Sequence, residues 1–407
     1  MNKKIINHKK IGEKLKLFFF SKNVGSELPL WLPNGVYLYK KIINFIKKIN
    51  LKNKYKEVYT PNIAKNSLYK KSGHLDKYYN YIFSLKKKKY YLKPMNCPFH
   101  CEIYKNYKNI SYKKLPIKFF EFGNVYRNEK SGVLNGLFRT ISFTQDDGHI
   151  FCRKKKKYIY KEIYKIIKII KFIYKLFFFK KFYIRFSFKK KNNNKYIGYK
   201  KYWDISEKIL LYIKKNINKK YKIKTYIKYN EAAFYGPKID FIIKDLFKRK
   251  WQLGTIQIDF NTPIRFNLKY INKYNIYKTP IIIHRAYLGS IERFIAIFLE
   301  NNNGKIPFWL LKINVIILPI NRIHLKYSLY IKNILILNNI KTKININFKE
   351  NLNKKIKKYE NIKIPFIFII GNKEVKKKKI FIRKNEIGEI GIFTIKNAIN
   401  YILINKN

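Results

Sequence analysis

Apolar residues recur along the chain with two different periods, which predict helices in some segments and strands in others. Tyr158 to Phe177 repeats isoleucine, tyrosine and phenylalanine at helical spacing with lysines between them, and this predicts a long amphipathic helix. Ile117 to Glu129 and Arg139 to Phe151 are predicted as two antiparallel strands, joined by a loop that holds Gly132 and Gly136. The first part of the chain therefore combines helices with a β-hairpin.

A different pattern begins near residue 310. Short β-branched runs at Ile313–Ile320, Ile364–Ile370 and Ile380–Arg383 alternate with segments of helical period at Ile323–Leu337 and Ile395–Ile404. This alternation is typical of a small α/β domain with a mostly parallel sheet. A chain of 407 residues, 47% of them hydrophobic, can bury a large core, and its length favours two or three domains. We expect one domain over residues 1–310 and a second over residues 311–407.

The formal net charge of +68 comes from 91 Lys and Arg residues against 23 Asp and Glu residues. Such an excess usually indicates a polyanionic partner such as a nucleic acid. Lys, Asn, Ile, Tyr and Phe fill much of the chain, however, and all five can be encoded without G or C, so drift in an AT-rich gene is a second cause of the charge. The scarce residue types therefore carry more information about function than the lysines do.

The cysteine content and the lengths of the apolar runs indicate in which cellular compartment the protein is found. Three cysteines are too few for a disulfide framework, which favours a reducing compartment and a metal-binding or packing role for each of them. No stretch approaches the ~18 uncharged apolar residues that a membrane-spanning helix needs. We therefore expect a cytoplasmic protein that has no membrane partner.

The predicted hairpin concentrates charged and polar side chains on one face. Because side chains alternate along a strand, Arg127 and Glu129 share a face of the first strand, while Gln145, Asp147 and His149 share a face of the second. If the two faces coincide, a single cleft receives cations, carboxylates and an imidazole. The planar guanidinium group of arginine donates two hydrogen bonds at once, which suits a phosphate. A surface strand with incidental ion pairs is the alternative interpretation.

A second segment, TPIIIHRAYLGSIERFIAIFLE, is predicted as an apolar strand that passes through His284, turns at Gly289 and enters a helix. Ser290 is suited to cap the N-terminus of that helix. Arg293 lies in the first turn, off the apolar stripe, and faces back towards the sheet. There its guanidinium group can stack on a base or pair with a terminal phosphate.

Six ordered stretches resemble the class II aminoacyl-tRNA synthetases, and in detail the threonyl-tRNA synthetases. They are KPMNCP (93–98), RNEKSGVLNGLFR (127–139), FTQDDGHIFC (143–152), AFYGPKIDF (233–241), WQLGTIQIDF (251–260) and HRAYLGSIERF (284–294). The resemblance continues through PFWLLKINVIILPI and IGNKEVKKKKIFIR. It implies an α+β catalytic domain with an antiparallel sheet, followed by a smaller α/β anticodon-binding domain, in a homodimer.

The resemblance also implies a threonine–tRNA ligase, which activates threonine with ATP and Mg²⁺ and transfers it to the 3′ end of threonine tRNA. The positions of Arg127, Lys238 and Arg293 are catalytic in that family, and Arg127 grips the α-phosphate of ATP. The implied ATP-binding residues are Arg127, Glu129, Arg139, Gln252, Thr255 and Arg293, and the implied substrate-binding residues are Met95, Gln145, Asp147, Tyr235, Gln257 and Ser290. Anticodon-reading positions of the family match Glu374 and Arg383.

One zinc ion per chain is implied as well, since the metal ligands of the family match Cys97, His149 and His284. One thiolate and two imidazoles suit zinc and leave a fourth position open. In the family this position takes the amino and hydroxyl groups of threonine, and the residue matching Asp147 accepts the hydroxyl proton. His100 and Cys101 lie close enough to Cys97 in the sequence to be alternative ligands.

The sequence also departs from the family. Phe99 stands where the family usually has Gly, Leu253 replaces a common Cys, and Asn135 a common His. The chain begins where the catalytic domain of the family begins, so we expect no counterpart of the N-terminal domain that hydrolyses mischarged seryl-tRNA. Two alternatives stay open: a sister class II synthetase for another small amino acid, and a synthetase-like RNA-binding protein that has lost catalysis. Zinc beside Gln145 and Asp147 favours threonine, and the three triphosphate arginines argue against lost catalysis.

Overall fold

The computed structural model describes residues 7–85, 87, 89–179, 181–190, 196–245 and 247–405, apart from the side chains at 131, 218 and 220. The chain divides into two compact units. Unit 1 comprises Met1–Phe19, Leu30–Ile42 and Asn302–Asn407, and unit 2 comprises Phe20–Pro29 and Ile43–Asn301. Each unit has its own sheet, so each is described by itself.

Unit 2 is built on an eight-stranded sheet in the order β10-β9-β11-β12-β15-β8-β7-β3. Its strands are β3 (Lys56–Glu57), β7 (Ile117–Tyr126), β8 (Ser142–Cys152), β9 (Phe182–Phe188), β10 (Thr225–Tyr229), β11 (Lys238–Lys244), β12 (Lys250–Asp259) and β15 (Ile281–Ala286). All neighbours from β9 to β7 are antiparallel, and the two edge strands β10 and β3 pair in parallel. The antiparallel sheet expected for the first domain is therefore confirmed.

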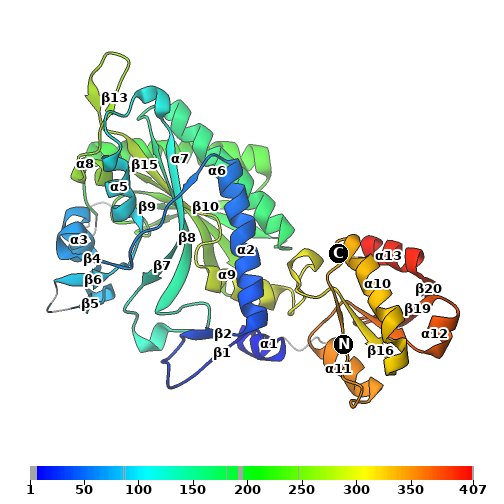
Figure 1. The fold of residues 1–407 in the computed structure, drawn as a ribbon. Coiled ribbons are helices and arrows are strands. Elements are labelled where there is room, and N and C mark those ends of the chain that lie inside the picture. Colours follow the sequence, from blue (N-terminus) through cyan, green and yellow to red (C-terminus); the bar gives the residue numbers. More distant parts are fainter. Residues whose placement is uncertain are drawn as a thin grey trace. The chain divides into compact units, whose positions relative to one another are not determined.

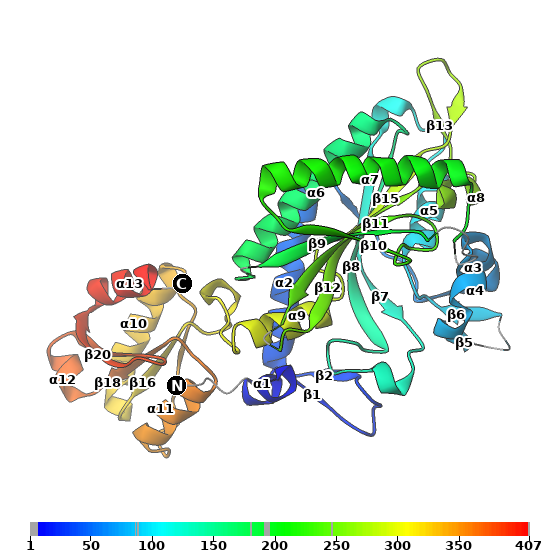
Figure 2. The ribbon, with the colours of Figure 1, turned by 180° about the vertical axis from the view of Figure 1, so that it is seen from behind.

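Helices α6 (Lys156–Leu176), α7 (Lys200–Tyr221) and α9 (Ile291–Asn301) pack on this sheet (Figures 1 and 2). Helix α6 forms within two residues of the segment that the helical period predicts, because its apolar stripe faces the sheet and its lysines face away. The stripe buries Ile159, Ile163, Ile166, Ile167, Ile170 and Ile173. At the start of α9 the hydroxyl group of Ser290 accepts a hydrogen bond from the backbone N–H of Arg293 at 3.2 Å, which is the predicted cap.

The remaining elements before residue 302 surround this sheet in the sequence. They are α1 (His8–Lys14), β1 (Phe18–Phe20), β2 (Pro29–Trp31), α2 (Pro33–Lys52), β4 (Ile63–Lys65), α3 (Asn66–Ser72), α4 (His74–Tyr78), η1 (Tyr79–Tyr81), β5 (Ser84–Leu85), β6 (Tyr90–Leu92), α5 (Cys97–Asn106), η2 (Tyr112–Lys114), η3 (Ser131–Val133), α8 (Asn261–Arg265), β13 (Tyr270–Ile271) and β14 (Tyr277–Lys278). Among them, α5 matters most for the site, because its first residue is Cys97.

Unit 1 contains a five-stranded sheet in the order β17-β16-β18-β19-β20. Its strands are β16 (Val315–Pro319), β17 (Thr342–Ile344), β18 (Phe366–Ile370), β19 (Lys379–Lys384) and β20 (Gly388–Thr394), and its helices are η4 (Phe308–Leu310), η5 (Arg322–His324), α10 (Leu325–Leu337), α11 (Leu352–Asn361), α12 (Asn372–Lys376) and α13 (Ile395–Ile404). Two apolar clusters, one on each face of the sheet, form its core. The strands and helices predicted from the pattern after residue 310 are all present.

The prediction of a mostly parallel sheet is wrong for half of this ladder. Strand β16 pairs in parallel with β17 and β18, but β18 pairs antiparallel with β19, and β19 antiparallel with β20. The connection from Lys384 to Gly388 is too short for the helical crossover that a parallel pair requires. The last strand can therefore return only in the antiparallel direction.

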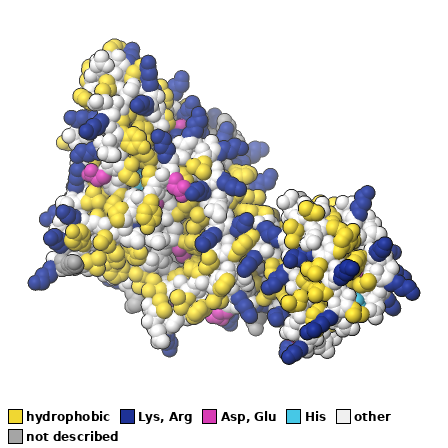
Figure 3. Space-filling view, in the orientation of Figure 1, with side chains coloured by type: hydrophobic (Ala, Val, Ile, Leu, Met, Phe, Trp, Pro, Cys, Tyr) yellow, Lys and Arg dark blue, Asp and Glu magenta, His cyan; other side chains and the backbone are white. Residues whose placement is uncertain are grey.

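Basic side chains are spread over the surface in Figure 3 and do not gather in a single patch on the visible face. The same face shows few acidic side chains (Figure 3). Within the described residues, no helix combines the length and the apolar character that crossing a membrane requires.

Candidate active site

Strands β7 and β8 bring the two polar faces of the predicted hairpin together. Glu121 lies opposite Asp147 and Gly123 opposite Gln145. Residues opposite each other on neighbouring strands point to the same side of a sheet. Both strands are shorter at the turn than predicted, since β7 ends at Tyr126 and β8 begins at Ser142.

The arginines of the hairpin therefore stand in its loop rather than in its strands. The loop closes on itself, because Asn135 N–H donates to the carbonyl of Arg139 at 3.1 Å, and Arg127 N–H donates to the carbonyl of Ile141 at 2.8 Å. These bonds replace the regular ladder beyond Tyr126. The loop thereby holds Arg127 and Arg139 at the edge of a cleft that Arg293 lines as well.

Three guanidinium groups share this cleft. Arg139 Nη2 donates to Glu129 Oε2 at 2.8 Å. Arg293 Nε donates to the carbonyl of Phe138 at 2.7 Å. Burial and the neighbouring charges of Arg127 and Arg139 lower the pKa of Arg293 to about 10, so it is still a cation at neutral pH.

Arg127 is the least engaged of the three. Its guanidinium group lies 5.1 Å from the centre of the Phe143 ring. Its Nε is buried without a hydrogen-bond partner among the described residues. A buried cationic donor of this kind is stabilised by an anionic ligand, and a phosphate oxygen satisfies it.

The opposite wall of the cleft comes from β11 and β12. Thr255 Oγ1 donates to Asp240 Oδ1 at 3.0 Å, and Lys238 Nζ lies 3.2 Å from Asp240 Oδ2. Asp240 is fully buried, so it fixes both side chains against the sheet. The hydroxyl group of Tyr235 donates to Gln257 Oε1. These contacts hold the polar groups of this wall in place.

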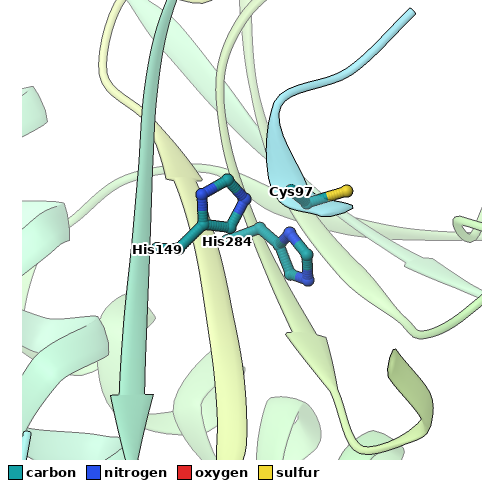
Figure 4. Close-up of side chains that lie close together, drawn as sticks. All are labelled: Cys97, His149 and His284. Atoms are coloured by element: carbon teal, nitrogen blue, oxygen red, sulfur yellow. The ribbon is translucent and has the colours of Figure 1, made fainter. Parts of the chain in front are cut away.

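Cys97, His149 and His284 converge in a pocket that adjoins the cleft (Figure 4). In the β15–β8 pair His284 lies directly opposite His149, and Cys97 is the first residue of α5. The three possible ligand atoms all lie within 4.8 Å of one another, and all three residues are buried.

The protonation states of these groups bear on metal binding. Burial lowers the pKa of His149 well below its ordinary value, so the imidazole is neutral, which is the form that binds a metal. Burial raises the pKa of the Cys97 thiol well above its ordinary value, so a thiolate needs a nearby cation. One sulfur and two nitrogens in a buried pocket are a donor set that fits zinc.

Asp147 reaches the same pocket from β8. Its Oδ2 accepts a hydrogen bond from Asn96 Nδ2 at 3.0 Å, and burial raises the pKa of its carboxyl group. The Asn96 side chain lies against Gly123, where a β-carbon would come within 2.4 Å of Asn96 Oδ1. Gly123 therefore provides the space that lets Asn96 support Asp147.

Every site residue predicted in unit 2 lines one of the two pockets. The cleft takes Met95, Arg127, Glu129, Arg139, Gln145, Tyr235, Lys238, Gln252, Thr255, Gln257, Ser290 and Arg293, and the inner pocket adds Cys97, Asp147, His149 and His284. The pockets share residues such as Gln145, Thr255 and Gln257, so they form one continuous site.

The two residues predicted in the last domain are on different elements of unit 1. Glu374 is in α12, where its Oε2 accepts a hydrogen bond from Gly371 N–H at 2.9 Å. Arg383 is in β19 and donates to Glu389 Oε1 at 2.6 Å and to Glu360 Oε1 at 3.4 Å. Both side chains are thus held by partners within unit 1.

Several residues at the site were not predicted. Asp259 accepts from His284 Nε2 at 3.0 Å, and strand alternation could have placed it on the face of Thr255 and Gln257. His74 Nε2 lies 3.1 Å from Met95 Sδ, and no local pattern signals this contact. His100, an alternative ligand by its closeness to Cys97 in the sequence, has its Nδ1 2.8 Å from His149 Nδ1.

Comparison with known proteins matches both units to families. The tRNA synthetase class II core domain family (G, H, P, S and T) matches residues 80–302, and the anticodon binding domain family matches residues 314–405. The threonine–tRNA ligase of Cytophaga hutchinsonii is 42% identical over 403 residues, which are 97% of this chain and 61% of that protein. That of Azobacteroides pseudotrichonymphae is 41% identical over 397 residues, 96% of this chain and 60% of that protein. The chain thus spans about three fifths of the length of these curated relatives.

Solved structures agree with these matches. A crystal structure of the RNA binding domain of threonyl-tRNA synthetase from Cryptosporidium parvum is 37% identical, with a TM-score of 0.85 and 98% of both chains covered. A putative threonyl-tRNA synthetase from Aeropyrum pernix is 29% identical, with a TM-score of 0.82, covering 98% of this chain and 94% of that one. The chain therefore belongs to the class II aminoacyl-tRNA synthetases and, within them, to the threonyl-tRNA synthetase family.

Proposed function

We propose that this chain is a threonine–tRNA ligase that forms threonyl-adenylate from threonine and ATP and then transfers threonine to the 3′ end of threonine tRNA. One observation carries the proposal. A cleft lined by three arginines opens into a pocket where a thiol, two imidazoles and a buried carboxylate converge. A phosphate-binding region thus adjoins a region suited to a small polar amino acid.

The arginines act at the phosphate end of this site. A carboxylate oxygen of threonine attacks the α-phosphorus of ATP, the bond to pyrophosphate breaks, and negative charge grows on the phosphate oxygens. Arg127, with its unpaired Nε, meets the α-phosphate, and Arg139 and Arg293 hold the rest of the triphosphate. Mg²⁺ accompanies ATP in this class of enzymes and neutralises further charge. No side chain acts as a nucleophile.

Other residues of the cleft orient the two substrates. Arg139 leaves Glu129 and turns to the phosphates, and Glu129 then accepts a hydrogen bond from the edge of the adenine. Gln252 and Thr255 contact the nucleotide, and Lys238 faces the reacting phosphate from the β11 side. The amino acid contacts Met95, Gln145, Tyr235, Gln257 and Ser290.

The inner pocket binds threonine. We propose that Cys97, His149 and His284 would hold one zinc ion per chain, which would act as a Lewis acid towards the amino and hydroxyl groups of threonine. Asp147 accepts the hydroxyl proton of threonine, and Asn96 fixes its carboxylate for that role. Valine has no hydroxyl group for Asp147, so the pocket rejects it through an unmade hydrogen bond.

The last domain and the basic surface are proposed to bind tRNA. The catalytic domain covers residues 1–310, and residues 311–407 bind the anticodon, with Glu374 and Arg383 reading bases once they exchange their present partners for RNA. The dispersed basic surface meets RNA phosphates, and this attraction weakens as salt rises. We further propose a cytoplasmic homodimer.

ATP–pyrophosphate exchange with each amino acid in turn tests the activity. We expect threonine to support the fastest exchange, and the purified chain to attach threonine to threonine tRNA. Exchange that is fastest with another small amino acid would favour a sister synthetase. No exchange with any amino acid in a folded, zinc-loaded protein would favour an RNA-binding protein without catalysis.

A further inference from the structure

A series of buried hydrogen bonds links His149 on β8 to His100 on α5, then to Glu121 on β7 and to Lys93. His149 Nδ1 lies 2.8 Å from His100 Nδ1. His100 Nε2 lies 3.1 Å from Glu121 Oε2. Lys93 Nζ donates to Glu121 Oε1 at 2.8 Å. His100, Glu121 and Lys93 are 0%, 2% and 1% exposed, so water does not compete for these contacts.

The donor and the acceptor of each of these hydrogen bonds follow in turn, starting from Glu121. Burial alone would raise the pKa of Glu121, but the hydrogen bonds from His100 and Lys93 outweigh this effect. The pKa of Glu121 is therefore lowered, and its carboxylate is ionised. An ionised carboxylate accepts hydrogen bonds and donates none. His100 must therefore donate from Nε2. A neutral imidazole carries a single N–H, so His100 Nδ1 is left to accept.

This order fixes the tautomer of His149. Its Nδ1 carries the proton and donates to His100, which leaves the lone pair on Nε2, the nitrogen 3.8 Å from Asp147 Oδ1 in the pocket. The reverse order would put the proton on Nε2, where it would prevent that nitrogen from binding a metal. The positive charge of Lys93 balances the negative charge of Glu121, so this row of hydrogen-bonded side chains brings no unpaired charge to the pocket.

The second imidazole, that of His284, is hydrogen-bonded to the carboxylate of Asp259. Its Nε2 lies 3.0 Å from Asp259 Oδ2, and the other oxygen, Oδ1, accepts from the backbone N–H groups of Asn261 and Thr262 at 2.8 and 2.9 Å. The carboxylate is thus held rigidly at the start of α8. Because it occupies Nε2 of His284, Nδ1 is the nitrogen that remains for a metal.

We propose that His100, anchored by Glu121, is a positioning residue of the metal centre, and that together with Asp259 it sets a site in which the ion binds Nε2 of His149 and Nδ1 of His284. This inference rests on the metal centre proposed above. His100 would thus orient the ligand His149 without binding the ion itself. Partners of this kind orient ligands, and their loss typically weakens metal binding by about 10 to 100-fold.

Two substitutions of His100 separate its two hydrogen bonds. His100→Asn places a side-chain amide near the position of Nδ1 and can still accept from His149, whereas His100→Gln places it near Nε2 and contacts Glu121 alone. Cys101→Ser is the matched control, because Cys101 is also fully buried in α5 but packs among apolar residues. Asp259→Asn tests the second partner.

The measurement is the zinc dissociation constant of the metal-free protein of residues 1–407, obtained by competition with a chromophoric chelator. We expect His100→Gln and Asp259→Asn to bind zinc about 10 to 100-fold more weakly, with His100→Asn and Cys101→Ser within about threefold of the parent. The thermal midpoint of each metal-free protein is measured alongside. A merely structural role would lower that midpoint and leave the affinity of the folded protein unchanged.

The outcomes distinguish this inference from the proposed function. A parent protein that does not bind one zinc per chain would overturn the metal centre itself. One zinc per chain in the parent, with His100→Gln within twofold of it, would overturn the positioning role alone. If His100→Gln does not fold, Glu121→Gln replaces it, since it keeps the shape of the side chain but loses the ionised acceptor, and the same thresholds apply.

Discussion

Replacing Gly123 with alanine is expected to weaken threonine activation without affecting the ATP end of the site. The new β-carbon would lie 2.4 Å from Asn96 Oδ1 and 2.6 Å from Asn96 Nδ2, far inside van der Waals contact. Asn96 is fully buried and short, so its amide group cannot swing out into solvent. It must therefore give up its 3.0 Å hydrogen bond to Asp147 Oδ2.

The size of the effect follows from that bond. A hydrogen bond to a charged group contributes about 1.5–3 kcal/mol, which corresponds to about 10 to 150-fold in affinity. In ATP–pyrophosphate exchange at saturating ATP, kcat/KM for threonine should fall by this factor, while KM for ATP stays within about twofold of the parent. The β-carbon of Gly132→Ala would meet nothing within 4 Å, so that variant is the control and should leave both parameters unchanged. A folded Gly123→Ala protein with kcat/KM for threonine within twofold of the parent would refute the reasoning.

Four further outcomes are expected. Arg127→Ala should abolish adenylate formation but leave the unfolding midpoint unchanged, because the buried Nε of Arg127 has no hydrogen-bond partner among the described residues; an exchange rate within threefold of the parent would contradict its role. Elemental analysis should find one zinc per chain, lost in Cys97→Ser and kept in Cys101→Ser; the opposite pattern would move the site to Cys101. Serine lacks only one methyl group, so it should be activated about 10 to 200-fold less efficiently than threonine in the exchange assay, and a much larger ratio would mean a tighter pocket. Asp146→Ala should cost about 3–5 kcal/mol in urea unfolding, because it leaves the fully buried Arg285 without its 2.7 Å partner, whereas a loss below 1 kcal/mol would show that this ion pair is not a stabilising contact.

The helices, and the side of a strand on which a residue lies, depend on residues close together in the sequence, and most of them could be predicted from it. Helix α6 and helix α13 could be predicted from apolar spacing alone, because a helical stripe is set by residues three and four positions apart. Strand alternation likewise placed Gln145, Asp147 and His149 on one face of β8. The chemistry of the arginines and the match to a known family supplied the site residues.

Tertiary structure decided which of these segments meet. Spacing rules cannot join Cys97, His149 and His284, since their convergence depends on the antiparallel pairing of β8 with β15 and on α5 packing against that sheet. The same is true of His100 and Asp259, which approach the two imidazoles from α5 and β12. The partly antiparallel ladder of unit 1 also escaped prediction, because strand direction follows from connection length and burial rather than from alternation. Local periodicity fixes where a side chain points on its own element, whereas the backbone hydrogen bonds and apolar burial of the whole sheet fix what that side chain faces.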